Sequence, residues 1–71
     1  MIKKNITVFI PCFNEEKNIP KLVHSWNEAI ERNKNISVLF INNGSIDDTL
    51  NLLNSEIALT KNNRINYYNV V

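Results

Sequence analysis

Two short runs of β-branched and aromatic residues limit the folds open to this chain. The first covers residues 6–10 and is followed by Pro11, and the second covers residues 37–41 and is followed by Asn42-Asn43-Gly44. Neither run alternates between apolar and polar residues, which is typical of strands buried on both faces of a parallel sheet. We therefore expect two parallel strands, each ending where its apolar run ends. A third such run, residues 64–71, predicts a third strand.

The segments between these runs have helical periodicity. In the first segment the apolar residues that recur at helical spacing are Ile19, Leu22, Val23, Trp26, Ala29 and Ile30. Asn18 is the expected N-cap, and Pro20 suits the first turn because a missing N–H costs little there. A second helix is expected to begin after Ser45, because residues 45–48 have the spacing of a capping box. Its apolar stripe is Leu50, Leu53 and Ile57.

Strand–helix–strand units of this length predict right-handed parallel crossovers. The expected fold class is therefore α/β, a βαβαβ arrangement of three parallel strands and two helices. Two crossovers of the same hand place both helices on one face of the sheet and leave an apolar face bare. We therefore expect residues 1–71 to form a partial domain, the truncated front part of a larger α/β domain.

Charge and composition exclude several functional classes. Eight Lys and Arg against seven Asp and Glu give a net charge of +1, so bulk charge provides no reason to bind nucleic acid or an anionic membrane. The single cysteine excludes an internal disulfide and a cysteine-only metal site. The apolar stretch of residues 8–10 is far shorter than the roughly 20 residues of a membrane helix. We therefore expect no membrane segment in this chain and a cytoplasmic location. The alternative is a location at the cytoplasmic membrane face, through regions outside this chain.

Polar segments follow the first two expected strands at their carboxyl ends, where open α/β sheets bind ligands. They cover residues 11–16 and 42–49, and the single glycine of the chain excludes a glycine-rich phosphate loop. Phe13 offers an aromatic face that can stack on a base, and the carboxylates and amides can hydrogen-bond a ribose or a base edge. Ordinary strand-to-helix turns use the same Asn, Gly and Ser residues, and spacing alone leaves both interpretations open.

Two motifs in these segments resemble the family 2 glycosyltransferases. Residues 8–16, VFIPCFNEE, resemble the family's opening motif I-P-x-Y/F-N-E-E, and residues 40–49, FINNGSIDDT, resemble its V-D-D-G-S-x-D-x-T segment. Residues 62–65 resemble the lead into the family's third strand. The resemblance covers essentially the whole chain and implies the nucleotide-binding, Rossmann-like half of a GT-A domain. The implied parent enzyme transfers a sugar from a nucleotide diphosphate sugar to a lipid or glycan acceptor, as in polysaccharide biosynthesis.

The same resemblance implies which residues bind the nucleotide. They are Pro11, Phe13, Glu15, Asn43, Gly44 and Ser45. Asn43 stands where the family has an aspartate that reads the base edge, and Asn42 replaces the acidic residue before it. Because an amide both donates and accepts, we expect a UDP-type donor to be preferred over a guanine nucleotide. Asp47 and Thr49 are expected to fix the start of the second helix.

No catalytic or metal-binding residue is expected within the chain. The resemblance implies Mg²⁺ or Mn²⁺ held by an Asp-x-Asp motif beyond the third strand, together with a base located there, so the chain alone is expected to be inactive. Asp47 and Asp48 are adjacent and open a helix, where carboxylates favour the helix dipole. The alternative function is a non-catalytic module that binds nucleotide or packs against a partner chain.

Three further residues have simple structural interpretations. His24 lies off the apolar stripe of the first helix and is expected to be solvated. Cys12 occupies the variable position of the first motif and is expected to be a small buried thiol. Trp26 lies on the apolar stripe and is expected in the core.

Overall fold

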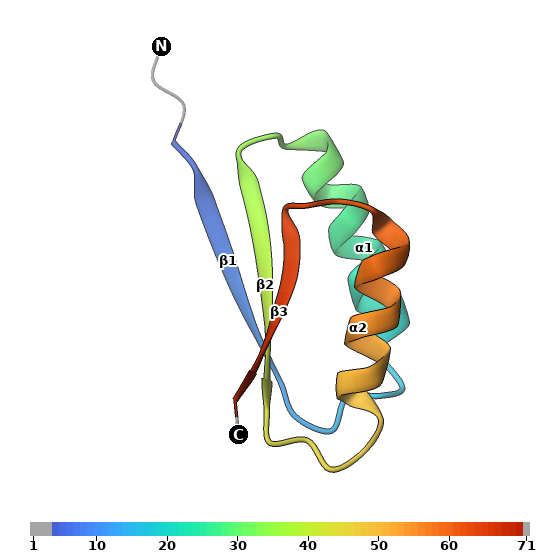
Figure 1. Ribbon diagram of the computed structural model, residues 1–71. Coiled ribbons are helices and arrows are strands. Elements are labelled where there is room, and N and C mark those ends of the chain that lie inside the picture. The colour runs from blue at the N-terminus through green and yellow to red at the C-terminus, as the bar shows by residue number, and fades with distance from the viewer. Residues whose placement is uncertain (1–3, 71) are drawn as a thin grey trace.

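The computed structural model describes residues 4–70. Within them, strands β1 (Ile6–Cys12), β2 (Ile36–Asn43) and β3 (Ile65–Val70) alternate with helices α1 (Ile19–Arg32) and α2 (Thr49–Thr60) (Figure 1). The strands lie in the order β1-β2-β3, and both neighbouring pairs are parallel. The predicted α/β class and βαβαβ arrangement are confirmed.

The strands run further than their apolar runs predicted. β1 passes through Pro11 to Cys12, and β2 passes through Asn42 to Asn43. A proline is tolerated in β1 because an edge strand has one side without a ladder partner. Asn42 is held in β2 by pairing with Cys12 on one side and Asn69 on the other. The prediction that β3 extends to residue 71 falls partly outside the described residues.

The helix starts show one correct and one wrong prediction. Helix α1 begins after Asn18, with Pro20 in its first turn, although the Asn18 side chain makes no capping hydrogen bond. Helix α2 begins only at Thr49, with Asp48 as its N-cap residue. The capping box at Ser45 is therefore wrong. The hydroxyl oxygen of Ser45 instead accepts a hydrogen bond from the N–H of Asn14 in the other loop.

Both helices pack on the same face of the sheet, and the core lies between the two layers (Figure 1). The buried apolar residues are Cys12, Ile19, Val23, Ile30, Val38, Phe40, Leu53 and Ile65. Trp26, which was predicted in the core, is half-buried and packs against it. His24 is exposed, as predicted, and its Nε2 lies 2.9 Å from a carboxylate oxygen of Glu28 on the next turn. Among the described residues, neither helix is long and apolar enough to cross a membrane.

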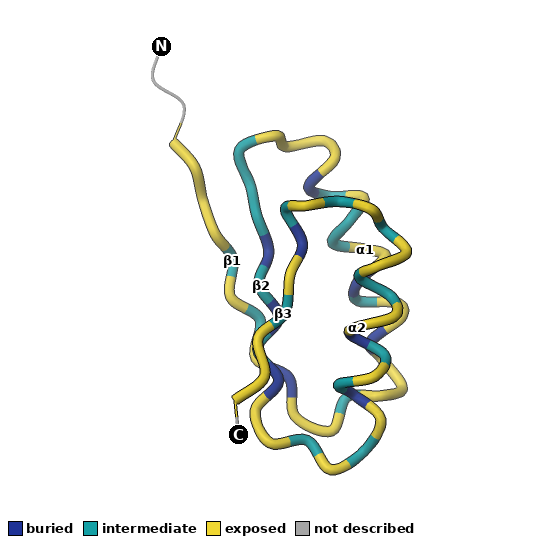
Figure 2. Tube along the Cα trace, in the orientation of Figure 1, coloured by how far each residue is buried: buried dark blue, intermediate teal, exposed yellow. Residues whose placement is uncertain are grey.

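The opposite face of the sheet has no helix over it, and much of β1 and β3 is exposed (Figure 2). Phe9 on β1 is 61% exposed and Tyr68 on β3 is 62% exposed. The parallel register sets Phe9 beside Leu39, and Ile41 between Pro11 and Tyr68. The prediction of a bare apolar face is therefore confirmed. β1 is also an outer strand of the sheet, so one of its sides has no strand beside it among the described residues.

Candidate functional site

The loop after β1 and the loop after β2 lie side by side at the carboxyl edge of the sheet (Figure 1). Asn14 joins them. Its N–H donates to Oγ of Ser45 at 2.9 Å, and its Oδ1 accepts from the N–H of Ile46 at 2.9 Å. Asn14 has a φ of 50°, a left-handed conformation that asparagine adopts more readily than most residues. The backbone and side chain of this one residue thus fix the first loop against the second.

The sequence analysis did not single out Asn14. The available signal was an asparagine directly after a strand, where left-handed turns occur. That signal gives the local conformation of Asn14 but not its partners in the second loop.

Thr49 makes a second connection between the loops. The N–H of Glu15 donates to Oγ1 of Thr49 at 2.9 Å, and the Thr49 hydroxyl donates in turn to Oδ1 of Asp47. The same Oδ1 accepts from the N–H of Thr49 at 3.0 Å, and Oδ2 of Asp47 accepts from the N–H of Glu16 at 3.3 Å. Asp47 and Thr49 therefore fix the start of α2, as predicted, and they also hold the first loop.

These hydrogen bonds set the ionisation of Asp47. Desolvation alone would raise the pKa of its carboxyl group. Donation from the Thr49 hydroxyl, the Thr49 N–H and the Glu16 N–H outweighs desolvation and lowers the pKa below its ordinary value. Asp47 is therefore an anion at neutral pH, with both oxygens bonded within the protein. Oδ1 of its neighbour Asp48 accepts from Nδ2 of Asn51 at 2.8 Å.

The structure brings the six predicted nucleotide-binding residues to this one edge. In the first loop Phe13 is 60% exposed and follows directly after Pro11 and Cys12 at the end of β1. Glu15 is half-buried, and its Oε2 accepts from Nδ2 of Asn18 at 3.0 Å. The first loop therefore presents an exposed ring and a positioned carboxylate.

The second loop carries the other three residues. Asn43 is the last residue of β2 and is exposed, Gly44 is exposed, and Ser45 is half-buried. Gly44 has a φ of 68° and open space where a Cβ would lie. A glycine is favoured there because of its left-handed backbone and not because of crowding. The turn carries the chain from the end of β2 to the contact between Ser45 and Asn14.

The adjacent amides Asn42 and Asn43 have different environments. Asn42 is only 2% exposed and lies on the face of β2 that carries the core residues Val38 and Phe40. Its Nδ2 donates to Oδ1 of Asn69 at 2.8 Å, whereas its own Oδ1 is buried with no partner among residues 4–70. Asn43 is on the other face and is exposed. Of the two amides, Asn43 is the one that a ligand at this edge can reach.

Cys12 lies beneath the first loop as a buried thiol, as predicted. Burial raises the pKa of this thiol, and the negative charge of Glu15 raises it further. Its Sγ is 3.7 Å from the carbonyl oxygen of Ile10, to which the thiol donates weakly. A protonated, buried thiol is a poor nucleophile. Cys12 is therefore part of the packing below the site.

The described residues do not fit the divalent cation that the resemblance implies. Within residues 4–70 no group of three or more His, Cys, Asp or Glu side chains could hold a metal ion. The carboxylates at the edge are engaged otherwise, since Asp47 bonds Thr49 and Glu16 while Glu15 bonds Asn18.

Comparison with known families identifies the class of protein that this fold and edge belong to. The model of glycosyl transferase family 2 matches residues 7–70, which include all five helices and strands almost completely. The chain belongs to glycosyl transferase family 2. Comparisons with curated proteins and with solved structures gave no significant match. The general function of the family is glycosyl transfer from a nucleotide sugar donor to an acceptor.

Proposed function

We propose that residues 1–71 form the nucleotide-binding portion of a glycosyltransferase domain whose donor is a UDP-type nucleotide diphosphate sugar. The parent enzyme transfers the sugar to a lipid or glycan acceptor. The observation that carries this proposal is the pair of joined loops. Hydrogen bonds of Asn14 and Thr49 join the loop that carries Phe13 and Glu15 to the loop that carries Asn43, Gly44 and Ser45. Mg²⁺ or Mn²⁺, where the parent enzyme uses it, is held by residues outside this chain.

The first loop is suited to the nucleoside. The exposed ring of Phe13 offers a stacking surface for the base, an interaction worth about 1–3 kcal/mol per base. The Glu15 carboxylate is an acceptor for ribose hydroxyl donors. Because Asn18 already bonds Oε2 of Glu15, the carboxylate is held in one orientation before the ligand arrives. Preorganisation of this kind lowers the entropic cost of binding.

The second loop is suited to reading the base. The Asn43 amide can accept from N3–H of uracil while donating to a neighbouring uracil carbonyl, which is a complementary pair. When the amide lies across the two adjacent guanine donors, N1–H and N2–H, its NH₂ faces one of them. A buried polar group left unpaired costs about 1–3 kcal/mol. The expected preference for UDP over GDP is therefore roughly ten- to hundredfold in Kd.

Titration calorimetry of UDP and GDP against the full-length protein tests the proposal. Native protein should bind UDP more tightly, and the Asn43→Asp variant should reduce the difference because a carboxylate accepts from either base. Phe13→Ala should weaken UDP and GDP alike, whereas Phe13→Tyr should leave both unchanged. Equal affinities in the native protein, or tighter GDP binding, would show that Asn43 does not read the base. The 71-residue chain alone should give no sugar transfer above a no-protein blank.

A further inference from the structure

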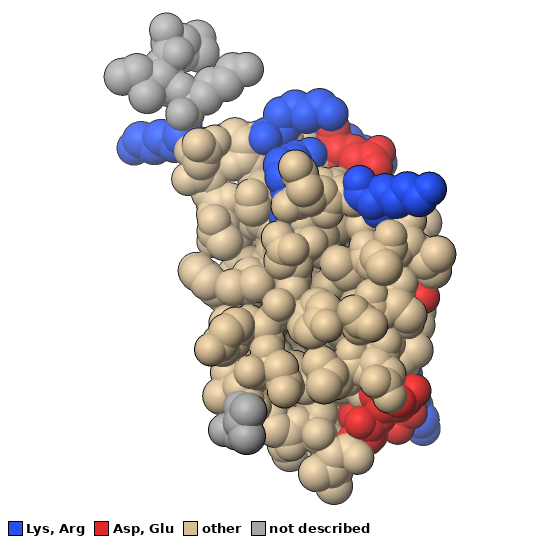
Figure 3. Space-filling model, in the orientation of Figure 1, with Lys and Arg blue, Asp and Glu red and all other residues tan. Residues whose placement is uncertain are grey.

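The net charge of +1 conceals a separation of charge along the strands. In Figure 3, most of the visible Lys and Arg side chains gather at the end of the molecule where the strands begin, with a group of Asp or Glu atoms among them. A second group of Asp and Glu atoms lies at the other end, beside a smaller area of Lys or Arg atoms. The cationic residues at the amino end of the sheet and in the loops beside it are Lys4, Arg32, Lys34, Lys61 and Arg64. We call these five residues the basic edge. Glu31 is the acidic residue placed among them.

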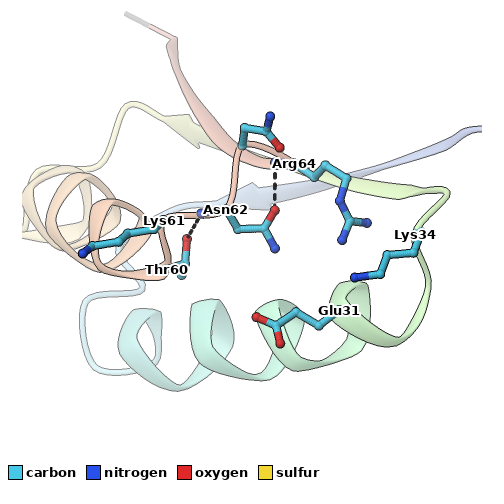
Figure 4. Close-up of a pocket in the computed structure, with 7 residues that line it drawn as sticks. Glu31, Lys34, Thr60, Lys61, Asn62 and Arg64 are labelled. Carbon is cyan, nitrogen blue, oxygen red and sulfur yellow. Dashed lines mark hydrogen bonds between the residues drawn. The ribbon is translucent and has the colours of Figure 1, made fainter.

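The loops of the basic edge have defined conformations. After α2, the N–H of Asn62 donates to Oγ1 of Thr60 at 3.2 Å, and the N–H of Arg64 donates to Oδ1 of Asn62 at 3.0 Å (Figure 4). In this turn Lys61 has a φ of 51° and an exposed side chain. Lys34 and Arg64 extend toward a common hollow between the turn and the end of α1, and Lys61 extends outward on its other side (Figure 4). The cations are thus spread across the edge by fixed turns.

We propose that the basic edge is a docking surface for an anionic phospholipid bilayer. Clusters of four to eight Lys and Arg residues attract the negative surface of anionic leaflets. Four of the five, namely Lys4, Arg32, Lys34 and Lys61, are exposed and can approach a surface together. Arg64 is half-buried and adds its charge from behind them.

The distribution of aromatic residues favours lipid over single-stranded nucleic acid. Proteins that bind single strands combine cations with aromatic rings on which bases stack. Among residues 4–70 the aromatic side chains lie in the strands, in the middle of α1 and in the loop at the opposite edge. The basic edge contains none of them. Binding to an anionic bilayer needs only positive charge and a broad surface that can lie against it. The ends of three neighbouring strands and two helices provide both.

This orientation has a consequence for the acceptor, which rests on the proposed function. The candidate site lies at the opposite ends of the strands from the basic edge. A strand of seven residues, such as β1, spans about 20 Å. The site would therefore open away from the bilayer and above it. That geometry favours a glycan acceptor that extends away from the bilayer surface. It disfavours an acceptor held at the level of the lipid headgroups.

Vesicle sedimentation tests the proposal. The chain is mixed with phosphatidylcholine vesicles that either contain or lack phosphatidylserine, at low and at high salt. The chain should bind the vesicles that contain phosphatidylserine and should not bind the neutral vesicles. High salt should release it from the phosphatidylserine vesicles. The Lys34→Gln/Lys61→Gln variant should lose roughly twenty-five-fold in partition coefficient, about fivefold for each lysine. The matched control is Lys17→Gln/Lys21→Gln, which makes the same charge change near the other edge and should bind nearly as well as the native chain.

Three results would overturn the proposal. They are equal binding to neutral vesicles, an equal loss in the matched control, and tighter binding of a single-stranded RNA oligonucleotide than of phosphatidylserine vesicles at the same salt. Circular dichroism of both variants checks that binding is not lost through unfolding. UDP binding by the Lys34→Gln/Lys61→Gln variant should be unchanged, which separates failure of the docking surface from failure of the proposed nucleotide site.

Discussion

The guanidinium group of Arg64, the residue just before β3, donates a hydrogen bond from Nη2 to the carbonyl oxygen of Ile30 in the last turn of α1, at 2.8 Å. Its Nη1 donates to the carbonyl oxygens of Asn33 at 2.9 Å and Ile36 at 2.7 Å. The final carbonyls of a helix have no partners within the helix. One side chain from the connection between α2 and β3 thus binds carbonyl oxygens at the end of α1 and at the start of β2.

Loss of Arg64 should destabilise the fold. Arg64→Met removes three charge-assisted hydrogen bonds and should lower the free energy of unfolding by about 2–4 kcal/mol, measured by urea denaturation. Arg64→Lys should recover only part of this, because an ammonium group cannot reach three carbonyls as a planar fork does. The control Arg32→Met lies in the same end of α1 but is exposed, and should cost less than about 0.5 kcal/mol. An equal loss of unfolding free energy in Arg64→Met and Arg32→Met would contradict the proposed role of the Arg64 guanidinium group.

The Thr49 hydroxyl should be needed to hold the two loops together. Thr49→Val keeps the shape of the side chain but leaves the N–H of Glu15 without its acceptor. The free energy of unfolding should therefore fall by about 1–3 kcal/mol. Thr49→Ser retains the hydroxyl and should cost less. Amide exchange at Glu15, followed by NMR, should accelerate in Thr49→Val and not in Thr49→Ser. Unchanged exchange in both variants would show that this bond does not fix the loop.

Asp47 should make stability depend on acid pH. Because its pKa is lower in the folded chain than in the unfolded chain, its stabilising effect is complete above the unfolded value of about 3.9 and is lost as pH falls through the folded value. Urea midpoints at neutral and at acid pH should therefore differ less in Asp47→Asn than in the native chain. Asp48→Asn makes the same charge change one residue away and is the control. The prediction fails if the two variants respond to acid alike.

Cys12 should resist alkylation while the chain is folded. Burial and the charge of Glu15 keep the thiol protonated, so iodoacetamide should modify it at least about tenfold more slowly than in urea. The raised pKa also implies that stability is complete below the unfolded pKa of about 8.5 and decreases as pH rises through the folded value. Glu15→Gln should speed alkylation slightly, because it removes the smaller of the two causes of the raised thiol pKa. Equal rates in buffer and in urea would contradict the buried position.

The bare face of the sheet should cause self-association of the isolated chain. Phe9 and Tyr68 are both exposed on that face, and exposed apolar patches and strand edges promote pairing between molecules. Sedimentation velocity should show oligomers that increase with concentration, and Phe9→Lys/Tyr68→Lys should shift them toward monomer. Leu59→Lys changes an exposed leucine on α2 instead and should not. A native chain that stays monomeric at high concentration would rule out this prediction.

The order of elements was predictable because each apolar run and each helical stripe is a local pattern. The exact ends were not, because they depend on neighbours in space. Pro11 stays in a strand since β1 is at the edge, and Asn42 stays in one since Cys12 and Asn69 flank it. The start of α2 was placed too early because the hydroxyl of Ser45 bonds the first loop instead of its own helix. In each case a contact from another element overrides the local preference.

The candidate site was predictable as two segments but not as a joined structure. The resemblance identified Phe13 and Asn43, whereas the hydrogen bonds of Asn14 that bring the loops together link residues 31 and 32 positions apart. The basic edge was hidden for a similar reason. The net charge of the chain carries no information on where each charged residue lies in space. The lysines and arginines of the basic edge come together only when the chain folds.

The spatial order of the strands equals their order in the sequence, and this has a consequence for synthesis on the ribosome. Each new βα unit can add beside the one already made, so the sheet can grow in the direction of translation. Ser45 is synthesised 31 residues after Asn14, roughly 2–6 s later at ordinary elongation rates. During that interval the first loop exists without its partner. Chains arrested before Ser45 should therefore be cleaved by protease within residues 13–18, and chains arrested after α2 has emerged should be protected there.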